Sequence, residues 1–301
     1  PWYGSVEKED LDRFLTRTPM GNKGTFGKVL VLAGSGAMCG AAVLCARAVL
    51  ASGAGMVKVV TEERNRTPLF CALPEAMADF WKEDEPLPEE ALLQDLAWAD
   101  AVVAGPGLSK SRTAKELLVF TVQHTEVPLV LDADALNLIA EDAEILSGCR
   151  AEKILTPHVG ELARLLHMTI AECQRDPAGS AGRAAEKYQA CCVRKDSVTV
   201  TAEEGREQYY INTSGSSALA TAGSGDVLAG ITGAFAAKRQ CEKNEKKISL
   251  AKTAALAAYA HGKAGEAAEE KSSASYVTAS EIIRGLQLSL IHISEPTRHS
   301  L

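Results

Sequence analysis

Short apolar runs alternate with longer segments of helical periodicity along most of the chain. The apolar runs predict buried strands, and they cover 28–33, 56–60, 101–104, 129–131 and 153–155. Each is followed by a turn and a helix-compatible segment, such as the small-residue helix Ala41–Ser52 that ends at Gly53. Continuous apolar strands with helical crossovers are typical of a parallel sheet covered on both faces. We therefore expect a three-layer α/β/α fold with a mainly parallel sheet.

The pattern changes after residue 190. Short strands separated by turns are expected over 191–193, 198–200 and 208–211, and they predict an antiparallel edge to the sheet. Helices follow, predicted over 226–238, 250–270 and 279–286. No repeat or low-complexity linker divides the chain, so residues 1–288 are expected to form a single domain.

Both ends of the chain look incomplete. The first residue is Pro1 rather than Met, which suggests that an upstream piece is absent. Residues 289–298 break the preceding helical pattern and resemble translated vector sequence. We expect 289–301 to be a non-native tail and exclude it from the fold.

Composition and net charge limit the kinds of molecule that this protein is expected to bind. Of the 301 residues 46% are hydrophobic and 24% charged, which is ordinary for a folded globular protein. The net charge of −7 leaves no excess of basic residues for nucleic acid or an anionic membrane surface. No run approaches the ~18 apolar residues of a membrane helix, and no signal peptide is visible. The eight cysteines lack metal-ligand spacing. A cytoplasmic protein acting on a small molecule is the expected class.

The turns that follow the predicted strands are rich in glycine and polar residues. Ligands of open parallel sheets bind beyond the carboxyl ends of the strands, so these turns are the candidate site. They cover 34–36, 105–107, 132–134, 156–161, 195–197 and 223–226.

The strongest of these signals is the Gly-Ser-Gly-Asp turn at 223–226, which leads into an apolar helix. Glycines before a helix let backbone N–H groups converge on an anion, and the helix dipole adds positive charge there. Asp226 could take a proton from a hydroxyl whose oxygen attacks phosphorus. A lone Asp at this place is more often a helix cap, but the other glycine turns at strand ends favour catalysis.

Several co-linear motifs together resemble the NAD(P)H-hydrate dehydratases, which have a ribokinase-like fold. The motifs are Lys23–Ser35, Gly105–Leu108, Leu131–Leu136, Leu155–His158 and Gly223–Gly230. The similarity runs from about Asp10 to Leu286. The Gly-Ser-Gly-Asp turn alone would indicate only the ribokinase-like fold.

The resemblance implies a cofactor-repair reaction. ADP phosphorylates the hydroxyl of the hydrated nicotinamide ring of (6S)-NADHX or NADPHX, and phosphate then leaves. The products are NADH or NADPH, AMP and phosphate, and Mg²⁺ offsets charge on the transferring phosphoryl group. The preference for ADP over ATP is also only implied.

The same resemblance implies roles for particular residues. Asp226 is the base, and it contacts the hydrated dinucleotide together with Gly107, His158 and Ala41 near the ring. The residues expected to hold the adenine nucleotide are Lys195, Asp196, Ser197, Val198, Thr199 and Gly225. The anion hole is expected from Gly223, Ser224 and Gly225. No motif identifies the metal ligands.

The resemblance extends to assembly. Family members commonly form tetramers, so a homo-oligomer is expected. The segment Glu7–Thr18 resembles the linker that follows an epimerase domain in many bacterial members. We expect this chain to be the C-terminal half of such a bifunctional protein.

The chain departs from the family pattern at several positions. Val159 replaces a proline after His158, which should loosen that turn. Asp196 stands where glycine usually follows the lysine, and this extra carboxylate would weaken phosphate affinity or point to solvent. Ser216 and Ser217 replace Asn-Pro or Asn-Gly, which leaves the nucleotide contacts open.

Other polar residues keep two interpretations. Asp132 either assists Mg²⁺ or positions substrate, and Asp134 is also placed to cap a helix. Glu161 either supports a metal site indirectly or is an ordinary acidic residue in a first helical turn. His124, His167 and His261 lie on helical segments and are assigned no function.

Three other functions compete. A ribokinase-like kinase acting on a thiazole or pyrimidine alcohol would use the same glycine turn and Asp226. A dinucleotide oxidoreductase is suggested by the strand leading into Gly34-Ser35-Gly36, but Cys39 occupies the third fingerprint position. A nucleotide sensor without catalysis would not need Asp226.

Overall fold

The structure is a computed structural model, and it describes residues 2–17, 20–242, 247–272 and 276–294. Ten strands of the described residues form one sheet in the order β1-β10-β9-β8-β7-β6-β5-β2-β3-β4. The strands are β1 (Trp2–Gly4), β2 (Lys28–Leu32), β3 (Met56–Glu62), β4 (Met77–Trp81), β5 (Ala101–Ala104), β6 (Leu129–Leu131), β7 (Lys153–Leu155), β8 (Cys191–Arg194), β9 (Thr199–Glu203) and β10 (Gln208–Asn212). Neighbours from β4 to β8 pair parallel, whereas β9 runs antiparallel to both β8 and β10.

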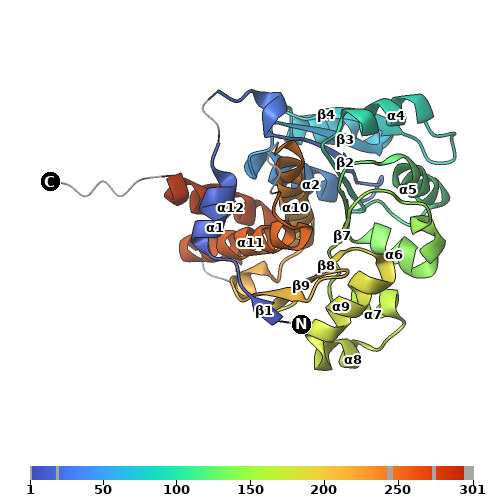
Figure 1. The fold of residues 1–301 in the computed structure, drawn as a ribbon. Helices are drawn as coiled ribbons and strands as arrows, with labels where there is room; N and C mark the ends of the chain where they lie inside the picture. Colours follow the sequence, from blue (N-terminus) through green and yellow to red (C-terminus); the bar gives the residue numbers. More distant parts are fainter. Residues whose placement is uncertain (1, 18–19, 243–246, 273–275, 295–301) are drawn as a thin grey trace.

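Helices cover both faces of the sheet (Figure 1). One face carries α1 (Lys8–Leu15), α2 (Cys39–Ala51), α3 (Arg66–Ala72), α10 (Ser224–Cys241), α11 (Leu250–Ser272) and α12 (Ala279–Ser294). The other carries α4 (Glu89–Trp98), α5 (Arg112–His124), α6 (Asp134–Glu141), α7 (Val159–Leu166), α8 (Ile170–Arg175) and α9 (Pro177–Tyr188). Short 3₁₀ turns occur at η1 (Lys23–Phe26), η2 (Glu63–Asn65), η3 (Ala143–Leu146) and η4 (Ser217–Leu219). Every helix among the described residues is too short or too polar to span a bilayer.

The predicted architecture is confirmed, with differences at the edges. The sheet is mainly parallel and has the expected antiparallel part at β8–β10. The edge strands β1 and β4 were not predicted; both lie at the margin of the sheet and are only partly buried, so neither forms a continuous apolar run. The helical pattern was expected to break at 289, but α12 continues to Ser294. Residues 295–301 of the expected tail lie outside the described residues.

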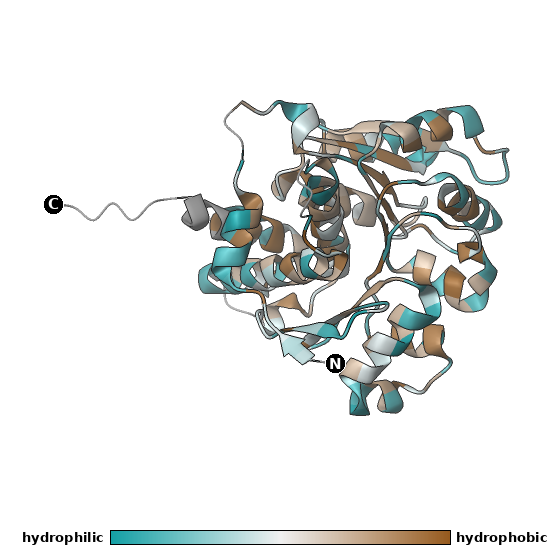
Figure 2. Cartoon of the chain, viewed as in Figure 1, coloured by the Kyte–Doolittle hydropathy of each residue, from teal (hydrophilic) through white to brown (hydrophobic). Residues whose placement is uncertain are grey.

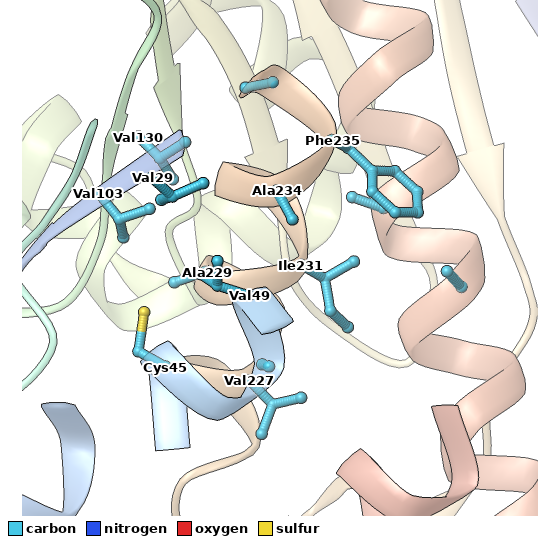
Figure 3. Close-up of a cluster of buried hydrophobic side chains, with 14 of the residues drawn as sticks. Val29, Cys45, Val49, Val103, Val130, Val227, Ala229, Ile231, Ala234 and Phe235 are labelled. Atoms are coloured by element: carbon cyan, nitrogen blue, oxygen red, sulfur yellow. The ribbon is translucent and has the colours of Figure 1, made fainter. Parts of the chain in front are cut away.

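The core beneath the candidate site is made by α10 packed against α2 and the sheet. Figure 3 shows Val227 and Ile231 of α10 beside Cys45 and Val49 of α2. A Cβ on Gly230 would lie 2.3 Å from the Cys45 carbonyl oxygen, so the two helices meet backbone to backbone. The apolar colouring concentrates on the strands and the helix faces turned toward them (Figure 2). This packing fixes the position of the N-terminus of α10.

The strand register places the polar turns along one edge. Ala104, Leu131 and Leu155 are paired neighbours at the ends of β5, β6 and β7. The residues that follow them are the glycine turn at 105–107, Asp132 and Thr156, so parallel pairing sets these groups side by side. An isolated parallel bridge between His158 and Lys195 extends the edge past β7.

Candidate active site

A buried ion pair lies at the centre of the site. Lys195 Nζ is 2.7 Å from Asp132 Oδ1, and the Thr156 hydroxyl donates to the same oxygen at 2.8 Å. Asp132 is 2% exposed. Burial works against the charge on Lys195, but the carboxylates of Asp132, Glu161 and Asp226 outweigh it and raise the pKa of Lys195. The site therefore contains a fixed ammonium group.

Asp226 lies in the first turn of α10 beside this pair. The helix begins after Gly223, whose φ of +85° is the left-handed conformation that favours glycine. Asp226 is three residues beyond this cap, and the interpretation of Asp226 as the helix cap is wrong. Burial and the nearby Asp132 carboxylate raise the pKa of Asp226 to about 7, against the opposing attraction of Lys195. A carboxylate with this pKa suits general-base work near neutral pH.

A cavity of about 940 Å³ opens beside the N-terminus of α10. Its polar wall includes most of the predicted nucleotide-binding residues, namely Lys195, Asp196, Ser197, Thr199 and Gly225, together with Ser224 of the predicted anion hole. Val198 does not line it and is 41% exposed. The facing wall carries the apolar side chains of Leu219, Leu228 and Ala258. The cavity thus has a charged end at the glycine turn and an apolar wall.

Two predicted substrate contacts, Ala41 and Gly107, meet outside this cavity. A Cβ on Gly107 would lie 2.8 Å from the Ala41 Cβ, so the loop backbone contacts the first turn of α2 directly. Leu44 lies one turn further along α2, and a Cβ on Gly223 would lie 2.5 Å from its Cδ1. The same stretch of α2 therefore adjoins both the Gly107 loop and the start of α10.

His158 has a structural role as well as a place in the site. It caps α7, because its Nδ1 accepts the backbone N–H of Gly160 at 2.9 Å, and Glu161 returns a bond to the His158 N–H. This reciprocal capping closes the turn in which Val159 replaces the family's proline. Burial and Lys195 lower the pKa of His158, which keeps the ring neutral. His158 also lines the cavity, and its Nε2 is 3.4 Å from Glu161 Oε1.

Glu161 belongs to the same electrostatic group. It is 6% exposed, and burial raises its pKa despite the attraction of Lys195. Asp134, in contrast, does not cap α6, which begins after Ala133. Its Oδ2 accepts the backbone N–H of Ser109 at 2.8 Å and so ties down the loop after Gly107.

The unusual Asp196 has a partner. Its Oδ2 accepts from Nη2 of the buried Arg194 at 3.1 Å, and its Oδ1 accepts the backbone N–H of Ser197 at 2.8 Å. The carboxylate is thereby paired with a buried cation, while the Asp196 side chain stays 36% exposed. Arg194 is 2% exposed, and its Nε has no hydrogen-bond partner among the described residues.

Sequence reasoning missed His261. It lies on α11, lines the cavity, and its Nε2 is 3.1 Å from the Ser224 hydroxyl. Burial and Lys195 lower the pKa of His261 to about 4, so the ring is neutral at physiological pH. The only available signal was its place in a helix; the contact with Ser224 depends on the packing of α11 against α10.

The free cysteines do not contribute to the site. Cys45, Cys173, Cys191 and Cys192 are buried, whereas Cys71 is exposed. Among the described residues, no group of three or more His, Cys, Asp or Glu side chains is arranged to hold a metal ion alone.

Comparison with known proteins identifies the family. A protein-family model described as NAD(P)H-hydrate dehydratase matches residues 29–288. The chain belongs to the NAD(P)H-hydrate dehydratase family. The resemblance inferred from the sequence motifs is therefore confirmed.

Curated members of the family match most of the chain. It is 36% identical over 288 residues to the bifunctional NAD(P)H-hydrate repair enzyme Nnr of Moorella thermoacetica, which covers 93% of this chain and 52% of that protein. It is 36% identical over 263 residues to the ADP-dependent (S)-NAD(P)H-hydrate dehydratase of Neisseria meningitidis, covering 85% and 82%. The chain spans about half the length of the bifunctional relatives it matches.

Solved structures agree on the fold. An ADP/ATP-dependent NAD(P)H-hydrate dehydratase from Bacillus subtilis, co-crystallised with ATP and Mg²⁺, has a TM-score of 0.80 at 28% identity and covers 96% of this chain and 98% of its own. A ribokinase-like superfamily protein from Enterococcus faecalis gives 0.81 at 27%, covering 98% and 97%. A hydroxyethylthiazole kinase from Pyrococcus horikoshii, at 0.63 and 19% over 95% and 93%, shares the fold alone.

Proposed function

We propose that this chain catalyses the ADP-dependent dehydration of (6S)-NADHX or NADPHX to NADH or NADPH, with release of AMP and phosphate. The observation that carries the proposal is Asp226, a half-buried carboxylate with a pKa of about 7 at a glycine-rich helix N-terminus, beside the Lys195 ammonium. Family membership supplies the substrate class.

The chemistry follows from these groups. Ionised Asp226 removes the proton from the ring hydroxyl while that oxygen attacks the β-phosphorus of ADP, and the bond to the AMP oxygen breaks. The ring then carries a phosphate ester in place of a hydroxyl. The ring nitrogen lone pair expels phosphate, and the neighbouring ring carbon loses a proton, which restores the double bond. Phosphate is a far better leaving group than hydroxide, which explains the need for a phosphoryl donor.

The cavity beside α10 suits the nucleotide. The charged end contains Lys195 and the backbone N–H of Gly225 at the start of α10, which favour the β-phosphate. The apolar wall of Leu219, Leu228 and Ala258 favours the adenine ring. Ala41 and Gly107 then hold the hydrated ring on the opposite side of Asp226, and His158 contacts the same substrate. Val198 contributes through its backbone.

The carboxylates present fit Mg²⁺. The Cβ position of Gly225 is 3.9 Å from Asp132 Oδ2, so this oxygen faces the phosphate turn while Oδ1 is occupied by Lys195. Mg²⁺ is usually held by one or two carboxylates, waters and substrate phosphates, so a cluster of three protein ligands is not needed. Asp132, with Glu161 through water, would hold the ion, which would offset phosphoryl charge.

Several wider features belong to the same proposal. ADP is the donor in the relative from Neisseria meningitidis, and we expect it to be preferred over ATP here. The bifunctional relatives support a partner epimerase domain in the full-length protein. A homotetramer in the cytoplasm completes the proposal, and light scattering of the purified chain would measure its mass in solution.

The deciding experiment measures whether the protein converts NADHX back to NADH, which is followed by the absorbance of the reduced nicotinamide ring. Purified protein is mixed with NADHX, Mg²⁺ and either ADP or ATP. Recovery with ADP is expected, and Asp226→Asn should abolish turnover while calorimetry still shows ADP binding. The exposed Asp84 makes Asp84→Asn a matched control with normal turnover. No recovery with either nucleotide in a folded protein would contradict the proposal and favour a kinase acting on another alcohol.

A further inference from the structure

A second cavity adjoins the turn that His158 caps. Its volume is about 760 Å³, and it is formed between α6 and α7. Gly160, in the turn that His158 caps, is part of its wall. Nothing in the proposed reaction so far uses this space.

The cavity contains an arginine that forms no ion pair with any of the described residues. Arg164 is exposed, and its Nε donates to the amide oxygen of Asn137 at 3.1 Å. Among the described residues no carboxylate forms an ion pair with its guanidinium, and Glu161 attracts it only from a longer distance. The bond to Asn137 orients the guanidinium plane and leaves its terminal N–H groups for a ligand. Lys110 also lines the cavity, but Glu141 neutralises it at 2.7 Å.

Both loops that carry proposed substrate contacts lead into this cavity. Gly107 is followed by Ser109, which is bonded to Asp134 of α6, and then by Lys110 on the cavity wall. His158 is followed by Gly160 on the same wall. A Cβ on Gly160 would lie 2.9 Å from His158 Cε1 and 3.9 Å from Arg164 Nη1, so the imidazole and the guanidinium are close neighbours.

A dinucleotide substrate needs such a space. Its reacting ring must lie at Asp226, and the ADP cavity occupies the side toward α11, so its second nucleotide half has to extend past His158. We propose that the α6–α7 cavity holds that half and that Arg164 binds the ribose 2′-phosphate, which makes NADPHX the preferred substrate. This inference rests on the proposed function.

The guanidinium of Arg164 offers more to a 2′-phosphate than its charge alone. A guanidinium offers paired N–H donors that match a phosphate, and an arginine near the adenosine ribose is a known way of accommodating a 2′-phosphate. NADHX has a hydroxyl at that position and gains little from the same group. The side chain therefore acts on the choice between the two substrates and leaves the reacting ring unaffected.

The test measures binding first, so that it does not depend on turnover. The stable cofactors NADP⁺ and NAD⁺ are titrated calorimetrically into the full chain at saturating ADP. We expect NADP⁺ to bind at least about tenfold more tightly than NAD⁺, which is the effect of one charged phosphate contact. Arg164→Met should remove this difference by weakening NADP⁺ alone, and Arg164→Lys should restore part of it.

The controls separate the possible failures. Arg13→Ala removes an exposed arginine on α1 that lines neither cavity, and it should leave both affinities unchanged. Equal affinities for NADP⁺ and NAD⁺ in the unaltered protein, or an equal loss of both in Arg164→Met, would overturn the proposal. If NADP⁺ selectivity depends on Arg164 but neither NADHX nor NADPHX is dehydrated, the binding site stands and the proposed reaction fails.

Discussion

Lys195 Nζ lies 2.7 Å from Asp132 Oδ1, so the ion pair reaches across the end of β7 from the strand on one side to the strand on the other. The two partners act on Asp226 in opposite senses, because Asp132 raises its pKa and Lys195 lowers it. The pKa of Asp226, the proposed base, is therefore set in part by an ion pair whose members follow two other strands. This arrangement leads to predictions that separate the two partners.

The first prediction concerns the pH dependence of turnover. Only ionised Asp226 can accept the hydroxyl proton, and burial raises its pKa to about 7. We expect kcat/KM for NADPHX at saturating ADP to fall as the pH decreases through this value. Initial rates between pH 5.5 and 9, with enzyme stability checked at each pH, measure it. Activity that stays constant down to pH 5.5 would exclude Asp226 as the base.

Substitutions of Lys195 and Asp132 should shift the pH profile of kcat/KM in opposite directions. Lys195→Met removes an attraction, so the pKa of Asp226 and the acidic limb of the profile should move upward. Asp132→Asn removes a repulsion, and the limb should move downward. Lower activity is expected in both variants, so the position of the limb is the informative quantity. A shift of both profiles in the same direction would contradict the electrostatic explanation.

The raised pKa of Asp226 also predicts that its ionised carboxylate lowers the free energy of unfolding. The folded-state pKa of Asp226 lies above the unfolded value of about 3.9, so the folded state binds more protons between these values. The contribution of Asp226 to stability therefore decreases as the pH rises toward 7 and above. Asp226→Asn removes this penalty, and its thermal midpoint should exceed that of the unaltered protein by several degrees at pH 8, or about 1–2 kcal/mol. The difference between the two midpoints should shrink as the pH falls through this window and vanish only below the unfolded pKa, at about pH 4.

The sequence predicted the parts of this molecule that depend on local pattern. Buried parallel strands such as Lys28–Leu32 are continuous apolar runs, and their carboxyl ends are marked by glycine and acidic residues. The glycine turn before α10 and Asp226 were found in this way. Edge strands such as Met77–Trp81 were missed, because they are half covered and have no clear period.

Long-range contacts could not be predicted from pattern. His261 reaches Ser224 only because α11 packs beside α10, and these residues are far apart in the chain. Arg194 was not singled out in the sequence, and its burial at the end of β8 beside Asp196 gives that carboxylate a cationic partner. In both cases the role of a residue depends on a contact that forms only in the tertiary structure.

The Arg194–Asp196 pair gives a fourth prediction. Asp196→Gly installs the residue common in the family, yet it leaves the buried Arg194 charge without its carboxylate. We expect a loss of about 2 kcal/mol or more in unfolding free energy and a higher KM for ADP. Adding Arg194→Met should recover most of the stability and part of the affinity. If Asp196→Gly alone binds ADP as well as the unaltered protein, the pair does not organise the segment.

The contact between Gly107 and α2 provides the last prediction. Gly107 has a φ of +57°, and a Cβ there would lie 2.8 Å from the Ala41 Cβ and 3.0 Å from the Met38 carbonyl oxygen. Gly148 also has a positive φ, of +75°, but nothing lies within 4 Å of its Cβ position. Gly148→Ala therefore measures backbone strain alone, about 1 kcal/mol. Gly107→Ala should cost about 2–3 kcal/mol and also raise the KM for the hydrated dinucleotide, because the loop must move away from α2. Chemical denaturation and steady-state kinetics on both variants measure the difference, and equal effects would show that the approach of Gly107 to Ala41 is not needed for the site.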